Sequence, residues 1–250
     1  MRILSWNLNG LKACLKSDTF EFLRDLRPDV ICFQEIRTNE EPVVLDGYHH
    51  FWNHGEPEGY SGTALLSQQE PLDVWNGFPD EFPDEEGRII TAEFDDYYII
   101  DVYVPNSQKN LQRQEFRREW DEALQDYVSG LMEEKPVIIC GDFNVAREPM
   151  DIFEGNTKQY WAQQGYTSDE RSDFESLLEE GLVDAFREMH PDEVSFTWWS
   201  NRLNKRLEDR GWRIDYFLVS DELMESVADV RHLSDIHGSD HCPILLETEP

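Results

Sequence analysis

A short apolar run within the segment 135–144 narrows the possible folds of this chain more than any other part of its sequence. Residues 137–140, Val-Ile-Ile-Cys, are typical of a strand buried on both faces of its sheet. Gly141 is expected to end the strand, and Asp142 and Asn144 follow where the chain leaves the core. Strand-end side chains often carry function because the sheet holds them rigidly. The same two residues are also common in turns, where they bond only to their own backbone.

The length and composition indicate one folded domain that covers residues 1–250. A chain of 250 residues suits a single large α/β domain, and a hydrophobic fraction of 39% can fill a core. No apolar run is long enough to span a membrane, and the first residues do not resemble a signal peptide. We therefore expect no membrane association.

The four cysteines, Cys14, Cys32, Cys140 and Cys242, lie far apart and match no zinc-binding spacing. At least two of them lie inside apolar runs, so we expect buried free thiols. Free thiols of this kind indicate a reducing, cytoplasmic compartment.

The hydrophobic pattern predicts many strands and only a few helices. Strands are expected at 3–6, 30–33, 63–66, 88–94, 97–104, 137–140, 196–199, 212–219, 227–233 and 242–247. Helices are expected at 18–26, 110–131 and 171–180, and a loop at 48–62. Because the strand pair 88–94 and 97–104 reads as a hairpin, a mixed sheet or two packed sheets is favoured over a simple doubly wound fold.

The charge is strongly negative but unevenly distributed. A formal net charge of −31 argues against a general affinity for nucleic acid. Nine of the 22 cations nevertheless fall in two short windows: Lys109, Arg113, Arg117 and Arg118, then Arg202, Lys205, Arg206, Arg210 and Arg213. The local field at a groove decides what binds there, although such cations can also be ordinary solvated charges. Adaptation to a saline host is one hypothesis for the acidic remainder.

Polar residues recur where the predicted strands end. The set is Asn7, Glu35, Tyr103, Asn106, Asp142, Asn144, Asp215, Asp240 and His241. Ligand sites in α/β folds gather at strand ends, so these side chains are expected to meet. Carboxylate and amide oxygens suit a hard cation such as Mg²⁺ or Mn²⁺, which points to hydrolysis of a phosphate ester. Taken singly, Glu35 would be solvated and Asp240 with His241 would form a surface turn.

His241 has the chemistry of a phosphate donor within this set. Asp215 is available to fix its tautomer and keep it charged. Donors of this kind hold the phosphate oxygens while a carboxylate orients the attacking water.

Six motifs resemble the exonuclease III class of abasic-site endonucleases, part of the endonuclease/exonuclease/phosphatase superfamily. They are S-W-N-L-N-G at 5–10, Q-E at 34–35, Y-V-P-N at 103–106, G-D-F-N-V-A at 141–146, W-R-I-D-Y-F at 212–217 and G-S-D-H-C-P at 238–243. The resemblance runs in register over essentially the whole chain. It implies a four-layer α/β sandwich, with two mixed β-sheets packed face to face and helices outside.

The resemblance also implies roles for the polar residues. Glu35 would be the principal metal ligand, with three further residues near the metal: Asn7, Asn9 and Asp240. Some relatives have Asp in place of Asn9, which leaves a second metal site open. Asp142 would activate or orient water, Asn144 and Asn106 would hold water and phosphate, and Tyr103 would contact the phosphate or the leaving group. His241, paired with Asp215, would bind the scissile phosphate.

By the same resemblance, Trp198, Trp212 and Ile214 form an apolar pocket for a flipped-out abasic sugar, although one Trp can be a core residue. Removing the base makes such extrusion cheapest, which is one source of selectivity. Lys109 stands where some relatives use Arg to clamp DNA, and Lys lacks the bidentate fork. We also expect Arg113, Arg202 and Arg213 to contact the substrate.

The resemblance predicts a Mg²⁺-dependent monomer, with Mn²⁺ as a substitute, acting on double-stranded DNA with abasic sites or 3′ blocks. It would cleave 5′ to abasic sites, with 3′-5′ exonuclease or 3′-phosphatase activity in addition. Two alternatives remain open at this point. One is a phosphatase acting on lipids or inositol phosphates, and the other is a nucleic-acid-binding regulator without activity.

Overall fold

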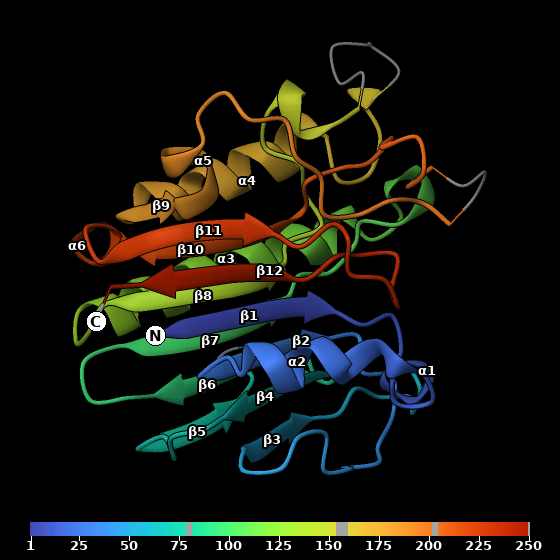
Figure 1. Cartoon of the computed structure of the whole chain (residues 1–250). Helices are drawn as coiled ribbons and strands as arrows, with labels where there is room; N and C mark the ends of the chain where they lie inside the picture. Colours follow the sequence, from blue (N-terminus) through green and yellow to red (C-terminus); the bar gives the residue numbers. More distant parts are fainter. Residues whose placement is uncertain (79–81, 154–159, 202–204, 250) are drawn as a thin grey trace.

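The structure, a computed structural model, describes residues 1–78, 82–153, 160–201 and 205–249 (Figure 1). Two mixed six-stranded sheets lie face to face. The first has the order β11 (Val227–His232), β12 (Ile244–Thr248), β1 (Arg2–Asn7), β2 (Val30–Gln34), β4 (Thr63–Ser67) and β3 (His49–Asn53). The second has the order β5 (Asp73–Asn76), β6 (Ile89–Glu93), β7 (Tyr98–Tyr103), β8 (Val137–Asp142), β10 (Asp215–Ser220) and β9 (Leu182–Asp184).

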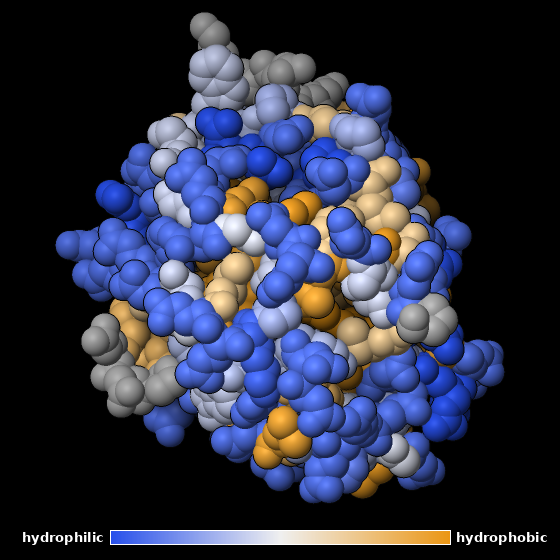
Figure 2. Space-filling model, turned by 90° about the vertical axis from the view of Figure 1, so that its left-hand side faces the viewer, coloured by the Kyte–Doolittle hydropathy of each residue, from blue (hydrophilic) through white to orange (hydrophobic). Residues whose placement is uncertain are grey.

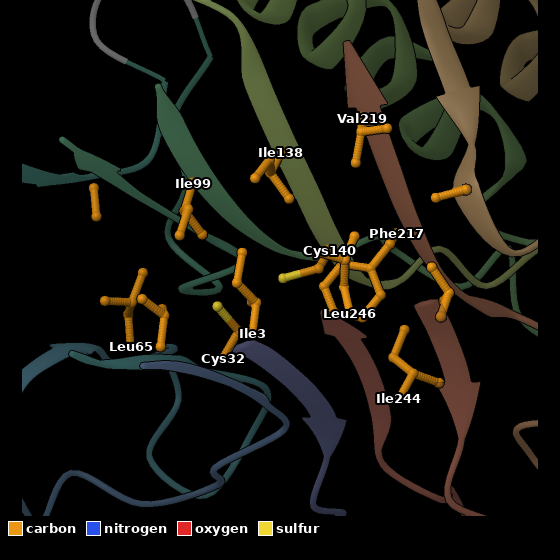
Figure 3. Packing of buried hydrophobic residues seen from close by; sticks show 14 of the residues in the cluster. Ile3, Cys32, Leu65, Ile99, Ile138, Cys140, Phe217, Val219, Ile244 and Leu246 are labelled. Atoms are coloured by element: carbon orange, nitrogen blue, oxygen red, sulfur yellow. The ribbon is translucent and has the colours of Figure 1, made fainter. Parts of the chain in front are cut away.

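Each sheet contains one parallel pair, β1 with β2 and β7 with β8, and the remaining pairs are antiparallel. Their inward-facing side chains form the central core, where Ile3 and Leu65 of the first sheet pack toward Ile138 and Phe217 of the second (Figure 3). A run such as 137–140 is apolar throughout because one face meets this core and the other meets a helix layer.

Helices cover the outer face of each sheet (Figure 1). On the first sheet lie α1 (Leu11–Leu15), the 3-10 turn η1 (Asp18–Phe20) and α2 (Glu21–Leu26). On the second lie α3 (Gln114–Met132) and α4 (Ser168–Glu179). The shorter helices are α5 (Ala185–Met189), α6 (Asp221–Met224) and the 3-10 turns η2 (Lys109–Leu111) and η3 (Pro149–Asp151). The predicted four-layer α/β sandwich is confirmed.

Local sequence explains the two long helices. In α3, Trp120, Leu124 and Val128 recur every four residues and are all buried against the second sheet. α4 begins at a capping box in which the Thr167 side chain accepts from the Glu170 backbone and Glu170 reciprocates. Among the described residues, no helix has the length and apolar character needed to cross a membrane.

Several local expectations were wrong. The segment 48–62 contains β3, an edge strand whose side chains are only partly buried, so it lacks a clear alternating pattern. Residues 196–199 form no strand, and Trp198 makes only isolated bridges to Trp212 and His241. Gly141 does not end β8 but lies inside it. A Cβ there would lie 1.9 Å from the Val102 carbonyl oxygen, so the close approach of β7 requires glycine.

Hydrophilic side chains cover most of the face that carries the chain termini, at the left of Figure 1, and apolar ones show mainly near its middle (Figure 2). The four cysteines are buried and free, as expected. Cys32 and Cys140 face one another between the sheets (Figure 3).

Candidate active site

A cavity of about 420 Å³ opens where the parallel strand pairs end. It is lined by most of the residues predicted for the site: Asn9, Glu35, Tyr103, Asn106, Lys109, Asp142, Asn144, Trp198, Trp212, Ile214, Asp240 and His241. Asn7 and Asp215 are buried behind this lining and hydrogen-bond to it. The polar strand ends therefore converge in space.

Three ionisable side chains meet in this cavity. Candidate ligand atoms of Glu35, Asp142 and His241 all lie within 4.8 Å of one another. The Nδ2 atom of Asn7 donates to Glu35 Oε1 and to Asp142 Oδ2, at 2.9 Å in each case. Since Glu35 follows β2 and Asp142 ends β8, this amide links the two sheets at the site.

His241 is held as an imidazolium. Its Nδ1 donates to Asp215 Oδ2 at 2.9 Å, and its Nε2 lies 3.7 Å from Asp142 Oδ2. Burial alone would lower the pKa of His241, but Asp215 and Asp142 together raise it to about 10. A ring protonated on both nitrogens donates from each of them, which suits His241 to hold an oxygen of a phosphate.

Asp142 both forms a turn with its own backbone and presents a carboxylate oxygen to the cluster. Its Oδ1 accepts from the Asn144 backbone N–H at 2.9 Å, which forms a turn, while Oδ2 faces Asn7 and His241. Asn144 has a φ of 48°, a conformation that Asn tolerates, and its Oδ1 accepts from Asn106 Nδ2 at 2.9 Å. Burial raises the pKa of Asp142 to about 7, although His241 opposes this. A carboxyl poised near neutrality suits proton transfer.

Tyr103 stands between two charged groups. Burial together with the nearby Glu35 charge raises the pKa of the Tyr103 hydroxyl well above its usual value. The Arg88 guanidinium carbon lies 4.5 Å from the Tyr103 ring centroid, and Arg88 Nη1 donates to the Tyr103 carbonyl at 2.9 Å. This buried cation fixes the ring against the end of β7.

A second set of polar side chains, centred on Asp240, also lines the cavity. Asn9 Nδ2 donates to Asp240 Oδ1 at 2.8 Å, and the Trp198 indole N–H donates to Asp240 Oδ2 at 3.2 Å. Both oxygens of Asp240 are thereby engaged. The Asn at position 9 supplies a donor here, which a carboxylate could not do when ionised.

An apolar niche forms the opposite wall. The rings of Trp198 and Trp212 meet edge to face, with centroids 6.2 Å apart, and Ile214 completes the wall. Trp212 also packs in a buried cluster with Tyr166, so it is both a core and a lining residue. Gly165 lies against this wall, and a Cβ there would come within 3.3 Å of the Trp212 ring.

The cavity thus combines a cluster of carboxylates and an imidazolium with an apolar niche. Known proteins show which family the chain belongs to. The model of the endonuclease/exonuclease/phosphatase family matches residues 4–241. The chain belongs to this family.

Similar proteins within the endonuclease/exonuclease/phosphatase family agree with the exonuclease III-class resemblance, which is confirmed. An exodeoxyribonuclease of Bacillus subtilis is 44% identical over 250 residues, or 98% of each chain. The DNA repair nuclease APEX1 of Danio rerio is 41% identical over 254 residues, which cover 98% of this chain and 81% of the relative. An AP endonuclease of Leishmania major has a TM-score of 0.90 at 29% identity, covering 100% of this chain and 88% of that one.

The donor atoms in the cavity fit the divalent metal on which this family depends. Glu35 and Asp142 offer carboxylate oxygens, which are the hard ligands that small divalent cations prefer. Among the described residues that line the cavity there is no thiol to select a softer metal.

Two cations predicted to contact the substrate do not line the cavity. Arg213 has a 0% exposed side chain and pairs with Asp151 and Asp184, so it cannot reach DNA. Arg113 does not line the cavity, because its guanidinium pairs with Glu86 at 2.9 Å. Lys109 does line the cavity, and Arg202 lies outside the described residues.

Other members of the two basic windows are also engaged inside the protein. Arg117 is buried, pairs with Asp121 at 2.6 Å and donates to the Phe143 carbonyl at 3.0 Å. Arg206 donates to the carbonyls of Ser234 and Ser239, which attaches its loop to the segment before His241. Several cations of these windows are therefore engaged by groups of the protein itself.

Sequence reasoning missed several residues of the cavity. Arg37, Gln108, Gln163, Gln164 and Gly165 line it. Arg37 stands two positions after the predicted metal ligand Glu35, which is the one local signal that pointed to it. The segment 163–165 carries no comparable signal, because its glutamines and glycine read as an ordinary connector.

Proposed function

We propose that this chain is a divalent-metal-dependent DNA repair phosphodiesterase that cleaves the backbone 5′ to abasic sites. The observation that carries the proposal is a single cavity in which a carboxylate and imidazolium cluster lies beside an apolar niche. Relatives named as AP endonuclease, exodeoxyribonuclease and 3′ phosphatase support it, and support 3′-5′ exonuclease or 3′-phosphatase action in addition.

The chain's own residues account for the handling of the phosphate and the water. The imidazolium of His241 donates from Nε2 to a non-bridging phosphate oxygen, since its Nδ1 is engaged by Asp215. Asp142 accepts the proton of the attacking water at Oδ2, while the Asn144 and Asn106 amides hold the water and the phosphate. The Tyr103 hydroxyl lies beside Glu35, where it contacts the phosphate or the leaving oxygen.

Mg²⁺ is the metal we propose, with Mn²⁺ as a substitute. Glu35 would be its principal ligand, with Asn7 nearby and Asp240 with Asn9 at the neighbouring position. When bound, such an ion polarises the phosphate and stabilises the negative charge that develops during hydrolysis.

The apolar niche accounts for lesion selectivity. Trp198, Trp212 and Ile214 offer apolar surface that suits a sugar without a base. Extrusion costs a few kcal/mol and is cheapest when the base is missing. Lys109 lines the same cavity and would hold the damaged strand as a point charge.

We further propose that the chain acts as a single catalytic domain and a monomer on double-stranded DNA in the cytoplasm. The free, buried cysteines support a reducing compartment. The two sheets share one core, which supports a single domain.

The test is cleavage of labelled abasic, nicked and intact duplexes, with and without Mg²⁺, by the wild type and by Asp142→Asn. Turnover on the abasic duplex should require the metal and fall about 10³-fold or more in the variant. Asp95→Asn, at an exposed turn residue, is the matched control and should retain full activity. Activity of Asp142→Asn within tenfold of the wild type would refute the assigned role. Hydrolysis of inositol phosphates without abasic cleavage would replace the proposed substrate.

A further inference from the structure

Arg37 lies at the cavity beside the proposed metal ligand and has no assigned role. Its Nη2 pairs with Glu35 Oε2, and both residues line the cavity. The Arg37 side chain is 44% exposed, whereas that of Glu35 is only 11% exposed. Within the described part of the chain, Glu35 is the one carboxylate that Arg37 contacts.

The backbone presents these two side chains together. Glu35 and Arg37 have φ values of 50° and 51°, in the left-handed region, while Ile36 between them is buried. The Ile36 and Arg37 backbone N–H groups donate to Gly62 at 3.1 Å and Ser61 at 2.9 Å. A rigid turn of this kind persists only where the surroundings hold it, so the two charges remain close to each other.

Arg37 occupies the side of Glu35 that faces solution. Asn7 takes Glu35 Oε1, and Arg37 takes Oε2, so a divalent cation that binds this carboxylate competes with the guanidinium. An ion pair with one half-exposed partner is weak enough to be exchanged. A released guanidinium in the cavity would find a DNA phosphate, for which its fork is well suited.

We propose that Arg37 exchanges partners, pairing with Glu35 in the free protein and with a DNA phosphate once a divalent ion takes Glu35. This inference rests on the proposed function, because it assumes that the same cavity binds metal and DNA. Arg37 thereby couples the two binding events: metal raises the affinity for DNA, and DNA raises the affinity for metal by the same factor.

Binding measurements test this without relying on turnover. Mn²⁺ binding to the DNA-free protein is followed by electron paramagnetic resonance, and binding of an abasic duplex by fluorescence anisotropy with and without Ca²⁺. Gels confirm that the duplex stays intact. Arg37→Met should bind Mn²⁺ about fivefold more tightly, equivalent to ~1 kcal/mol for a pair with one half-exposed partner. The variant should lose about tenfold or more in DNA affinity with Ca²⁺ but less than twofold without it.

Lys109→Met is the matched control, because Lys109 is exposed, lines the same cavity and makes no side-chain ion pair within the described residues. It should weaken DNA binding equally with and without Ca²⁺ and leave the Mn²⁺ affinity within twofold. Arg37→Lys should restore part of the metal dependence.

Two results would overturn the inference. Weaker Mn²⁺ binding in Arg37→Met would mean that Arg37 orients Glu35 for the metal instead of competing with it. An equal loss of DNA affinity with and without Ca²⁺ would mean a fixed phosphate contact. If the wild type cleaves abasic DNA and Arg37→Met gives either result, only this inference is refuted. If the wild type binds neither Mn²⁺ nor the abasic duplex, the proposed function is refuted too.

Discussion

Replacing Arg213 by Met distinguishes a structural role for this arginine from the substrate contact that the sequence suggested. Arg213 Nε donates to Asp151 Oδ1 at 2.7 Å, and Arg213 Nη1 to Asp184 Oδ1 at 3.0 Å. Asp151 also accepts from Arg187 Nη2 at 2.6 Å. The substitution keeps most of the buried stem but removes the charge that neutralises two buried carboxylates.

The expected loss of stability follows from this pairing. Asp151 keeps Arg187, but Asp184 keeps only the Arg187 backbone N–H at 3.2 Å and becomes a buried unpaired charge. Breaking a buried ion pair from one side costs about 3–5 kcal/mol. For a domain of this size, that corresponds to a fall in melting temperature of roughly 6–20 °C.

Urea denaturation and thermal melting measure the effect, and anisotropy measures the affinity for an abasic duplex. Arg210→Met, at a nearby exposed arginine, is the control and should change the unfolding free energy by about 0.5 kcal/mol or less. The double variant Arg213→Met, Asp184→Asn should recover part of the loss, because the unpaired charge is gone. An Arg213→Met protein as stable as the wild type but tenfold weaker on DNA would refute the structural assignment.

Two further substitutions test the niche and the sheet interface. Gly165→Val should lower abasic cleavage more than tenfold. The φ of Gly165 is +80°, and the new Cβ would lie 3.2 Å from the Asn144 carbonyl oxygen and 3.3 Å from the Trp212 ring. Steady-state kinetics on the abasic duplex measure the effect, and unchanged kinetics would contradict it. At Asp101, burial raises the pKa of the carboxyl well above 3.8, while Gln34 Nε2 donates to it at 2.6 Å. The unfolded chain therefore releases this proton first, so wild-type stability falls as pH rises above about 4. Asp101→Asn should gain unfolding free energy relative to the wild type between pH 4 and pH 8 in urea titrations, and parallel pH profiles would exclude this explanation.

Much of the site could be predicted from the sequence because its signals are local. Glu35 and Asp142 each stand two positions after an apolar run, and His241 follows a turn beside Asp240. Strand ends on one side of a sheet must lie near one another, so their convergence follows from the fold. The family resemblance then assigned roles that local patterns alone do not distinguish.

The partners of the arginines could not be predicted, because they depend on contacts between distant segments. Arg213 pairs with Asp151, 62 positions earlier, and with Asp184, 29 positions earlier. Arg113 pairs with Glu86, 27 positions earlier. Clustering along the sequence shows which cations are close in the chain. It does not show which of them pair with a carboxylate in the folded protein. The strand β3 was missed for a related reason, since its identity as an edge strand depends on pairing with β4.

Because several arginines are buried, they affect the electrostatic potential that DNA encounters as it approaches this protein. Arg88, Arg117, Arg187 and Arg213 are buried beside acids, so they project little positive potential beyond the surface of a chain with 53 acidic residues. At 0.1 M salt the repulsion between the duplex and the acidic surface is largely screened beyond about 10 Å, so that surface and the cavity's own cations act only at closer range. Dissolved salt therefore assists the encounter while it weakens the final grip. We therefore expect little sliding along undamaged DNA.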